Sequence, residues 1–157
     1  MDILVENYGK LYGAITIDRF DGFKSPFAGI LFPCLIWDHE GCFADAERSA
    51  VAKALLEAGC RYAVCGGKNC EAWHLAFDME FVEVHLNDPD EVLDSVHVMT
   101  TQHDGESPDD VAFFFVLCTN FNDHEFRRYL VLHVGSGPAK AQVDATVRKY
   151  ALNKDAV

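Results

Sequence analysis

Apolar residues along this chain fall into short runs that alternate with helix-like segments. Residues 28–37 form an almost continuous apolar run, which predicts a strand buried on both faces with Pro33 at an irregularity or an edge. Residues 45–58 place apolar positions on one helical face, and Gly59 after them is typical of a helix end. Residues 60–66 predict the next strand. The pattern therefore indicates strand, helix and strand in succession.

The middle of the chain gives mixed signals. Asn69 is positioned to cap a helix that runs toward Asp78. Residues 81–86 alternate between apolar and polar, which predicts a half-exposed strand. Residues 88–91 are typical of a turn or of the start of a short helix.

Three elements are expected after a strand at residues 96–101. Ser107 followed by proline is a helix start, and it favours a helix over residues 108–120, although residues 112–118 alone also fit a strand. Residues 128–134 are rich in Leu and Val and predict a strand. An amphipathic helix is expected after the glycine-containing loop that follows them.

These elements predict a single α/β domain over residues 1–157. Strands separated by helices favour a three-layer, Rossmann-like fold, in which a mostly parallel sheet carries helices on both faces. Residues 1–27 are the least predictable, because Gly9 and Gly13 interrupt an extended pattern around residues 11–17. A chain of 157 residues can bury a sizeable core.

The charge of the chain restricts its partners. The chain contains thirteen Lys and Arg and 25 Asp and Glu, so its formal net charge is −12. Such a chain is a poor binder of nucleic acid or of an anionic membrane surface, and a basic protein partner is favoured. The first residues show no signal peptide and no apolar run is long enough to span a bilayer, so a cytoplasmic protein with reduced cysteines is expected.

The acidic residues gather in short segments that follow the apolar runs. These segments are residues 38–40, 88–91, 104–110 and 123–125. In a parallel sheet the strands end at one edge, where binding sites form, so several acidic loops are expected to build a negative field there. Glycine loops at residues 66–69 and 135–138 match no phosphate-binding fingerprint, and no cofactor is expected.

Several short runs resemble a family of uncharacterised bacterial proteins. The matching residues are Trp37, the run Gly59-Cys60-Arg61-Tyr62, Cys70 and Trp73, and Val98-Met99-Thr100-Thr101 with His103. The similarity covers roughly residues 35–135 and implies a cytoplasmic bacterial α/β domain. It assigns no role to any residue. Gln102 stands where an aromatic residue is expected in that family.

Two functions from different classes are compatible with these features. The first is an immunity protein, whose carboxylates occlude the active site of a basic toxin such as a nuclease. Its expected contacts are Asp38, Glu40, Asp104, Glu106 and Asp109, with Trp73 as an anchor if it is exposed rather than in the core.

The second is a small hydrolase or transferase at the same edge. Cys70 at a helix start would be its nucleophile and His74 or His103 its base, or a metal-bound water would attack with His39, His103 and Asp104 as ligands. No Cys-x-x-Cys, His-Glu-x-x-His or Gly-x-Ser-x-Gly pattern accompanies these residues. A third interpretation is a subunit of a larger assembly.

Overall fold

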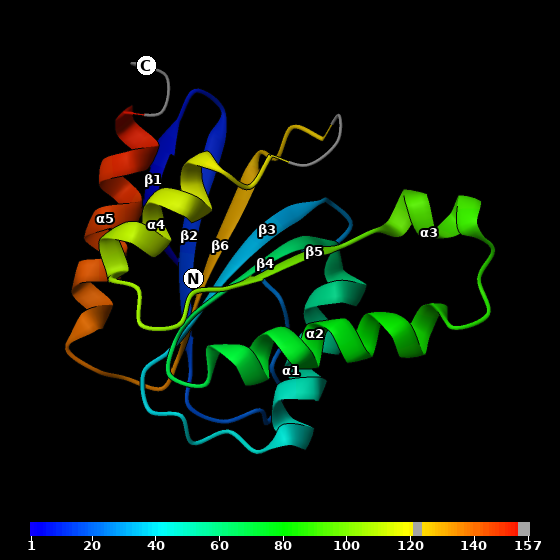
Figure 1. Cartoon of the computed structure of the whole chain (residues 1–157). Helices are drawn as coiled ribbons and strands as arrows, with labels where there is room; N and C mark the ends of the chain where they lie inside the picture. Colours follow the sequence, from blue (N-terminus) through cyan, green and yellow to red (C-terminus); the bar gives the residue numbers. More distant parts are fainter. Residues whose placement is uncertain (121–123, 154–157) are drawn as a thin grey trace.

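Six strands form one sheet in the computed structural model, which describes residues 1–120 and 124–153 (Figure 1). The strands are β1 (Asp2–Asn7), β2 (Lys10–Ile17), β3 (Phe32–Asp38), β4 (Cys60–Gly67), β5 (Met99–Gln102) and β6 (Arg128–Val134). They lie side by side in the order β1-β2-β6-β3-β4-β5. β1 runs antiparallel to β2, and every other neighbouring pair of these six is parallel. The prediction of a mixed α/β fold with a mostly parallel sheet is confirmed.

Helices pack against the sheet from two sides. The helices are α1 (Asp45–Ala58), α2 (Cys70–His85), α3 (Asp90–Val96), α4 (Pro108–Leu117) and α5 (Ala139–Asn153). Buried residues of α1 and α2 form one core cluster with Cys34, Ile36 and other strand residues. Buried residues of α4 and α5 form a second cluster with Leu35, Trp37 and their neighbours. Successive β3 residues therefore point into different clusters, as the pleat of a strand requires.

The centre of the sheet is β3, between β6 and β4, and every residue of this strand is buried. Its near-continuous apolar sequence matches that position, since a parallel strand covered on both faces has no solvent side. Pro33 lacks a backbone N–H, and the pairing with β4 shifts between Phe32 and Pro33. The irregularity predicted at this proline is confirmed.

Local sequence explains the ends of two helices. α1 ends at Gly59, whose φ of 119° favours glycine, and a Cβ atom there would lie 2.2 Å from the carbonyl oxygen of Ile30. α4 begins after Ser107, whose hydroxyl accepts a hydrogen bond from the backbone N–H of Asp110. The segment from 112 to 117, which also fitted a strand, is helical because this cap starts the helix just before it.

The structure differs from the prediction in three places. Residues 81–86 are not a strand, because α2 continues to His85 and Leu86 follows as its C-cap. The strand β1 was not predicted: it pairs with β2 through a tight turn at Tyr8 and Gly9, which both have positive φ. β5 also begins only at Met99, after the short helix α3.

No helix in the described part of the chain is long and apolar enough to cross a membrane.

Candidate functional site

The parallel strands end on one side of the sheet, which we call the carboxyl edge. After β3 the chain turns to α1, and after the neighbouring β6 it turns to α5, in the other core cluster. Such a point, where chains leave adjacent strands toward opposite faces, opens a crevice in α/β folds. A hollow of about 460 Å³ lies here, and its lining includes Trp37, His39, Lys68, Glu106 and Pro138.

Asp38 and Trp73 form a buried pair beneath this crevice. Trp73 Nε1 donates a 2.8 Å hydrogen bond to Asp38 Oδ2, and the backbone N–H groups of Glu40 and Gly41 donate to Oδ1. Asp38 is 1% exposed and Trp73 is fully buried. The structure therefore corrects the expectation that Asp38 contacts a partner, and it places Trp73 in the core, which was the alternative to an exposed anchor. They hold the β3–α1 loop against α2, because a buried carboxylate requires such donors.

Two histidines and an aspartate form a chain of hydrogen bonds next to the same crevice. His39 Nε2 lies 2.9 Å from His133 Nδ1, and His133 Nε2 lies 2.8 Å from Asp144 Oδ1. His133 on β6 is fully buried, Asp144 comes from α5, and His39 is half-buried in the β3–α1 loop. The chain thus links the loop, the sheet and the helix.

The hydrogen bonds between these three side chains are compatible with one simple set of donors and acceptors. A carboxylate oxygen accepts, so His133 Nε2 is the donor to Asp144, and in the tautomer with the proton on Nε2 the Nδ1 atom of His133 accepts from His39. His39 then donates from Nε2 and keeps a lone pair on Nδ1. Burial, followed by the nearby His133, lowers the pKa of His39 below its ordinary value. His39 is therefore a neutral hydrogen-bond acceptor at neutral pH.

Neither His133 nor Asp144 was a predicted site residue. His133 lies in a Leu- and Val-rich strand, and its position there was the only sequence signal for it. Asp144 is on the next helix, and nothing in the spacing indicates that the two side chains meet.

Exposed carboxylates do gather at the carboxyl edge. Glu40 follows β3, and Asp104 and Glu106 follow β5, and all three residues are exposed. Glu106 lines the crevice beside His39. Asp104 lines an adjoining hollow of about 420 Å³ together with Glu71 and Leu75 of α2. Asp104 and Glu106 therefore reach the same edge as the strand ends, whereas Asp38, another of the five predicted carboxylates, lies below the surface.

Asp109 makes a different set of contacts. Its carboxylate accepts hydrogen bonds from the Tyr150 hydroxyl at 2.6 Å and from Lys149 Nζ at 3.1 Å. The Tyr150 hydrogen bond, followed by that of Lys149, lowers the pKa of Asp109. This predicted contact residue already joins α4 to α5.

The residues of the predicted enzyme do not form a reactive group. Cys70 is 2% exposed, and burial, with Asp104 as the second cause, raises the pKa of its thiol. Such a thiol is a poor nucleophile. His103 Nδ1 contacts Glu106 and its Nε2 lies 3.0 Å from Thr101 Oγ1, so both ring nitrogens have partners. His74 faces Asp78 on α2.

The metal set proposed from His39, His103 and Asp104 is not assembled either. Among the described residues, no group of three or more His, Cys, Asp or Glu side chains is placed to hold a metal ion. His39 instead contacts His133, and His103 contacts Glu106.

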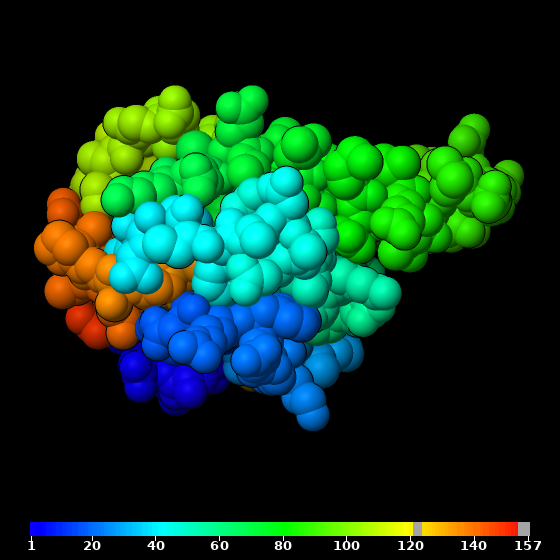
Figure 2. Space-filling view, turned by 90° about the horizontal axis from the view of Figure 1, so that it is seen from below, coloured from blue at the N-terminus to red at the C-terminus, as the bar shows by residue number. Residues whose placement is uncertain are grey.

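The charge of the chain is divided sharply along the sequence. Residues 69–126, which we call the acidic segment, contain fourteen of the 25 acidic residues and none of the 13 Lys and Arg. The segment includes α2, α3, β5 and α4. Asp123, within one of the predicted acidic loops, lies outside the described residues. The far end of α2 and α3 projects from the rest of the molecule, coloured green in Figure 2.

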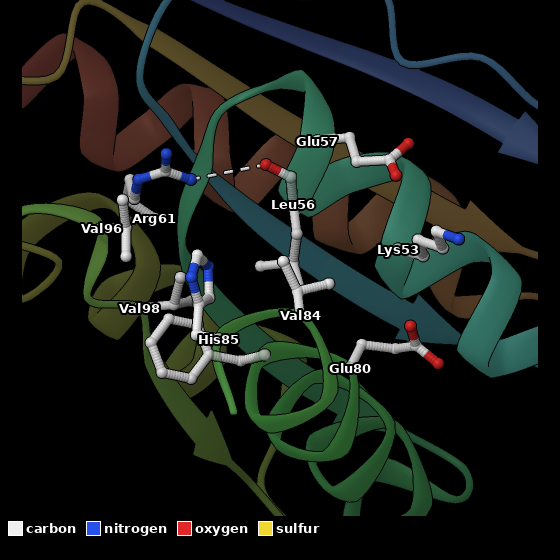
Figure 3. A pocket seen from close by; sticks show the side chains of 10 residues that line it. Lys53, Leu56, Glu57, Arg61, Glu80, Val84, His85, Val96 and Val98 are labelled. Carbon is white, nitrogen blue, oxygen red and sulfur yellow. Dashed lines mark hydrogen bonds between the residues drawn. The ribbon is translucent and has the colours of Figure 1, made fainter. Parts of the chain in front are cut away.

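A separate hollow of about 240 Å³ lies near the start of β4, away from the carboxyl edge (Figure 3). Its apolar lining includes Phe81 and Val84 of α2, and charged side chains of both signs stand around it, among them Lys53, Glu80 and Arg61. Arg61 Nη1 donates to the carbonyl oxygen of Leu56 at 3.4 Å. The hollow contains none of the predicted site residues, and its mixed charge gives no preference for an ion.

The fold and the edge define a mixed α/β domain with a mostly parallel sheet and exposed carboxylates at its carboxyl edge. The chain belongs to the family described as a domain of unknown function (DUF7684), whose family model matches residues 19–150. The expected membership of an uncharacterised family is confirmed, over a longer stretch than the resemblance covered. Comparison with curated proteins and with solved structures finds no match.

Proposed function

We propose that this protein binds a basic protein partner through its acidic segment, in the manner of an immunity protein that neutralises a toxin. The observation that carries the proposal is the charge division: the acidic segment of 58 residues has fourteen acids and no Lys or Arg. A surface of one sign attracts an oppositely charged partner over distance and speeds association.

The exposed carboxylates at the carboxyl edge are the proposed point of first contact. Glu40, Asp104 and Glu106 are exposed, and Asp104 and Glu106 belong to the acidic segment. They would pair with Lys and Arg residues that line the active site of a toxin such as a nuclease. On this proposal the protein acts in the bacterial cytoplasm, on a three-layer, Rossmann-like scaffold whose outer layers are the helices of the two core clusters.

The test is capture from a bacterial lysate by immobilised protein, compared between two charge-reversed variants. Asp104→Lys/Glu106→Lys reverses two charges at the carboxyl edge. Asp2→Lys/Glu6→Lys makes the same change of charge at exposed positions of β1, the outermost strand at the other end of the sheet from β5. Asp104→Lys alone serves as a second edge variant, because Glu106 also contacts His103.

We expect a Lys- and Arg-rich protein to be captured by the wild type and to bind the edge variants at least about tenfold more weakly. The β1 variant should bind it almost as the wild type does. If the partner is a nuclease, stoichiometric wild type should block its cleavage of nucleic acid. Equal capture by all variants, or capture of proteins without an excess of Lys and Arg, would refute the proposal.

A small-molecule site is the second candidate function, and the Asp144–His133–His39 chain favours it. This chain presents a neutral imidazole acceptor at a crevice of about 460 Å³, which is the usual place for ligands in α/β folds. His39 would then be the base of an enzyme at this edge, in place of Cys70 and His103.

A further inference from the structure

The outer face of α2 carries a row of exposed apolar side chains. Leu75, Met79, Val82 and Leu86 are 57%, 59%, 52% and 72% exposed, and we call this row the apolar stripe. Their spacing of four, three and four residues keeps them on one side of the helix. Trp73 and Phe77, on the opposite side, are fully buried in the core. The stripe is thus additional to the face that α2 buries in the fold.

An apolar row with this spacing matches the surface that a helix presents to another helix. Positions that repeat every three and four residues form the contact seam of paired helices. Contiguous exposed apolar surface is uncommon on proteins that act alone and marks interaction sites. From Leu75 to Leu86 the stripe spans twelve residues, or about 16 Å of helix.

Acidic residues stand on both sides of the stripe. Around the helix, Glu71 and Asp78 lie next to one side of it and Glu83 next to the other, at 100° per residue. α2 contains no Lys or Arg. Two copies of this helix packed along their stripes would bring these carboxylates together, which is unfavourable. A partner with Lys or Arg beside its own apolar row would pair with them.

The helix α3 provides a second sign of incomplete burial. None of its residues is buried, it has seven residues, and Val92 on it is 39% exposed. It follows the C-terminal end of α2 in the projecting part of the molecule (Figure 2). At the other end, Leu75 shares a hollow with Asp104 of the carboxyl edge. The stripe therefore continues the proposed contact surface from the edge along α2.

We propose that the apolar stripe of α2 is the docking site for an amphipathic helix of the basic partner, with Leu-like residues on one face and Lys or Arg along its borders. This inference rests on the proposed function and adds to it the form of the partner segment. The edge carboxylates supply long-range attraction, and the stripe supplies the desolvated contacts on which tight binding depends.

The test uses a synthetic helical peptide with Leu at the repeating contact positions and Lys beside them. A second peptide has the same composition in an order without an apolar face, and a third has Glu in place of Lys. The stripe variant is Leu75→Gln/Met79→Gln, which leaves the charge unchanged. The matched control is Ile3→Gln/Leu152→Gln, which removes apolar side chains that are 62% and 53% exposed elsewhere.

We expect the wild type and the control to bind the first peptide. The stripe variant should bind it at least about tenfold more weakly. Glu71→Gln/Glu83→Gln should weaken binding and reduce its dependence on salt. Equal binding of the first and the reordered peptide, binding of the Glu peptide, or an unaffected stripe variant would overturn the inference. So would stripe-dependent dimerisation of the protein alone in sedimentation.

The two proposals fail separately in these experiments. If Asp104→Lys/Glu106→Lys loses the captured basic protein and the stripe variant keeps it, the proposed function stands and the docking site is refuted. If the stripe variant loses the captured protein and the edge variants bind it as the wild type does, the stripe binds a partner but the electrostatic function is refuted.

Discussion

At the scale of single residues, the carboxyl edge combines buried and exposed acids that look alike in the sequence. Asp38 is satisfied by Trp73 and two backbone N–H groups, whereas Asp104 two strands away is exposed. Acidic loops following strands could be predicted from the order of elements. Which carboxylate turns inward depends on donors such as Trp73 Nε1, which are far away in sequence.

The lowered pKa of His39 predicts how stability responds to acid. The unfolded state takes up a proton near the ordinary pKa of 6.5, while the folded state resists it because of burial and His133. The free energy of unfolding should therefore fall as the pH decreases below about 6.5. Above that pH, His39 is neutral in both states and this destabilisation should be absent.

The measurement is denaturant unfolding of the wild type and of His39→Gln between pH 8 and pH 5, at about half-unit steps. The difference between the two proteins should change over the acidic part of the range and stay constant above it. A constant difference throughout, or an NMR titration of His39 with a pKa above 6.5, would contradict the proton assignment.

At the scale of elements, the sequence predicts those whose apolar residues are buried. α1 and β6 have the expected bounds, and α4 starts at the expected residue, because periodicity and caps agree there. Residues 81–86 fail for the opposite reason: Val82 and Leu86 are apolar but exposed, so their pattern does not describe a core-facing side. The wrong strand prediction and the apolar stripe have the same cause, which is that these apolar side chains are exposed to solvent.

The start of α4 provides a prediction at this scale. Ser107 Oγ accepts from Asp110 N at 3.1 Å, so Ser107→Ala should lower the free energy of unfolding by about 1 kcal/mol. The control is Ser49→Ala inside α1, which should change it by less than about 0.5 kcal/mol. Denaturant unfolding at neutral pH gives both values, and an equal loss in the two variants would show that the cap does not stabilise the helix.

At the scale of the whole molecule, the charge division gathers more than half of the acidic residues, and no Lys or Arg, in the segment that contains the elements between β4 and β6. The acidic segment contributes α2, β5 and α4, and eleven of the 13 Lys and Arg lie before residue 69 or after residue 139. The net charge could be read from composition and the acidic loops from their order. The continuity of these acids with an exposed helix face could not be predicted, because the packing of α2 in the folded protein sets which of its side chains are exposed.

The central claim, that a basic protein binds the acidic segment, is tested most directly by hydrogen exchange of the protein with and without its captured partner. We predict slower exchange in α2 and in residues 102–110 on binding, with loss of this protection at high salt, and no change in β1 and β2. Protection confined to β1, β2 or α5, or protection that does not respond to salt, would contradict the claim.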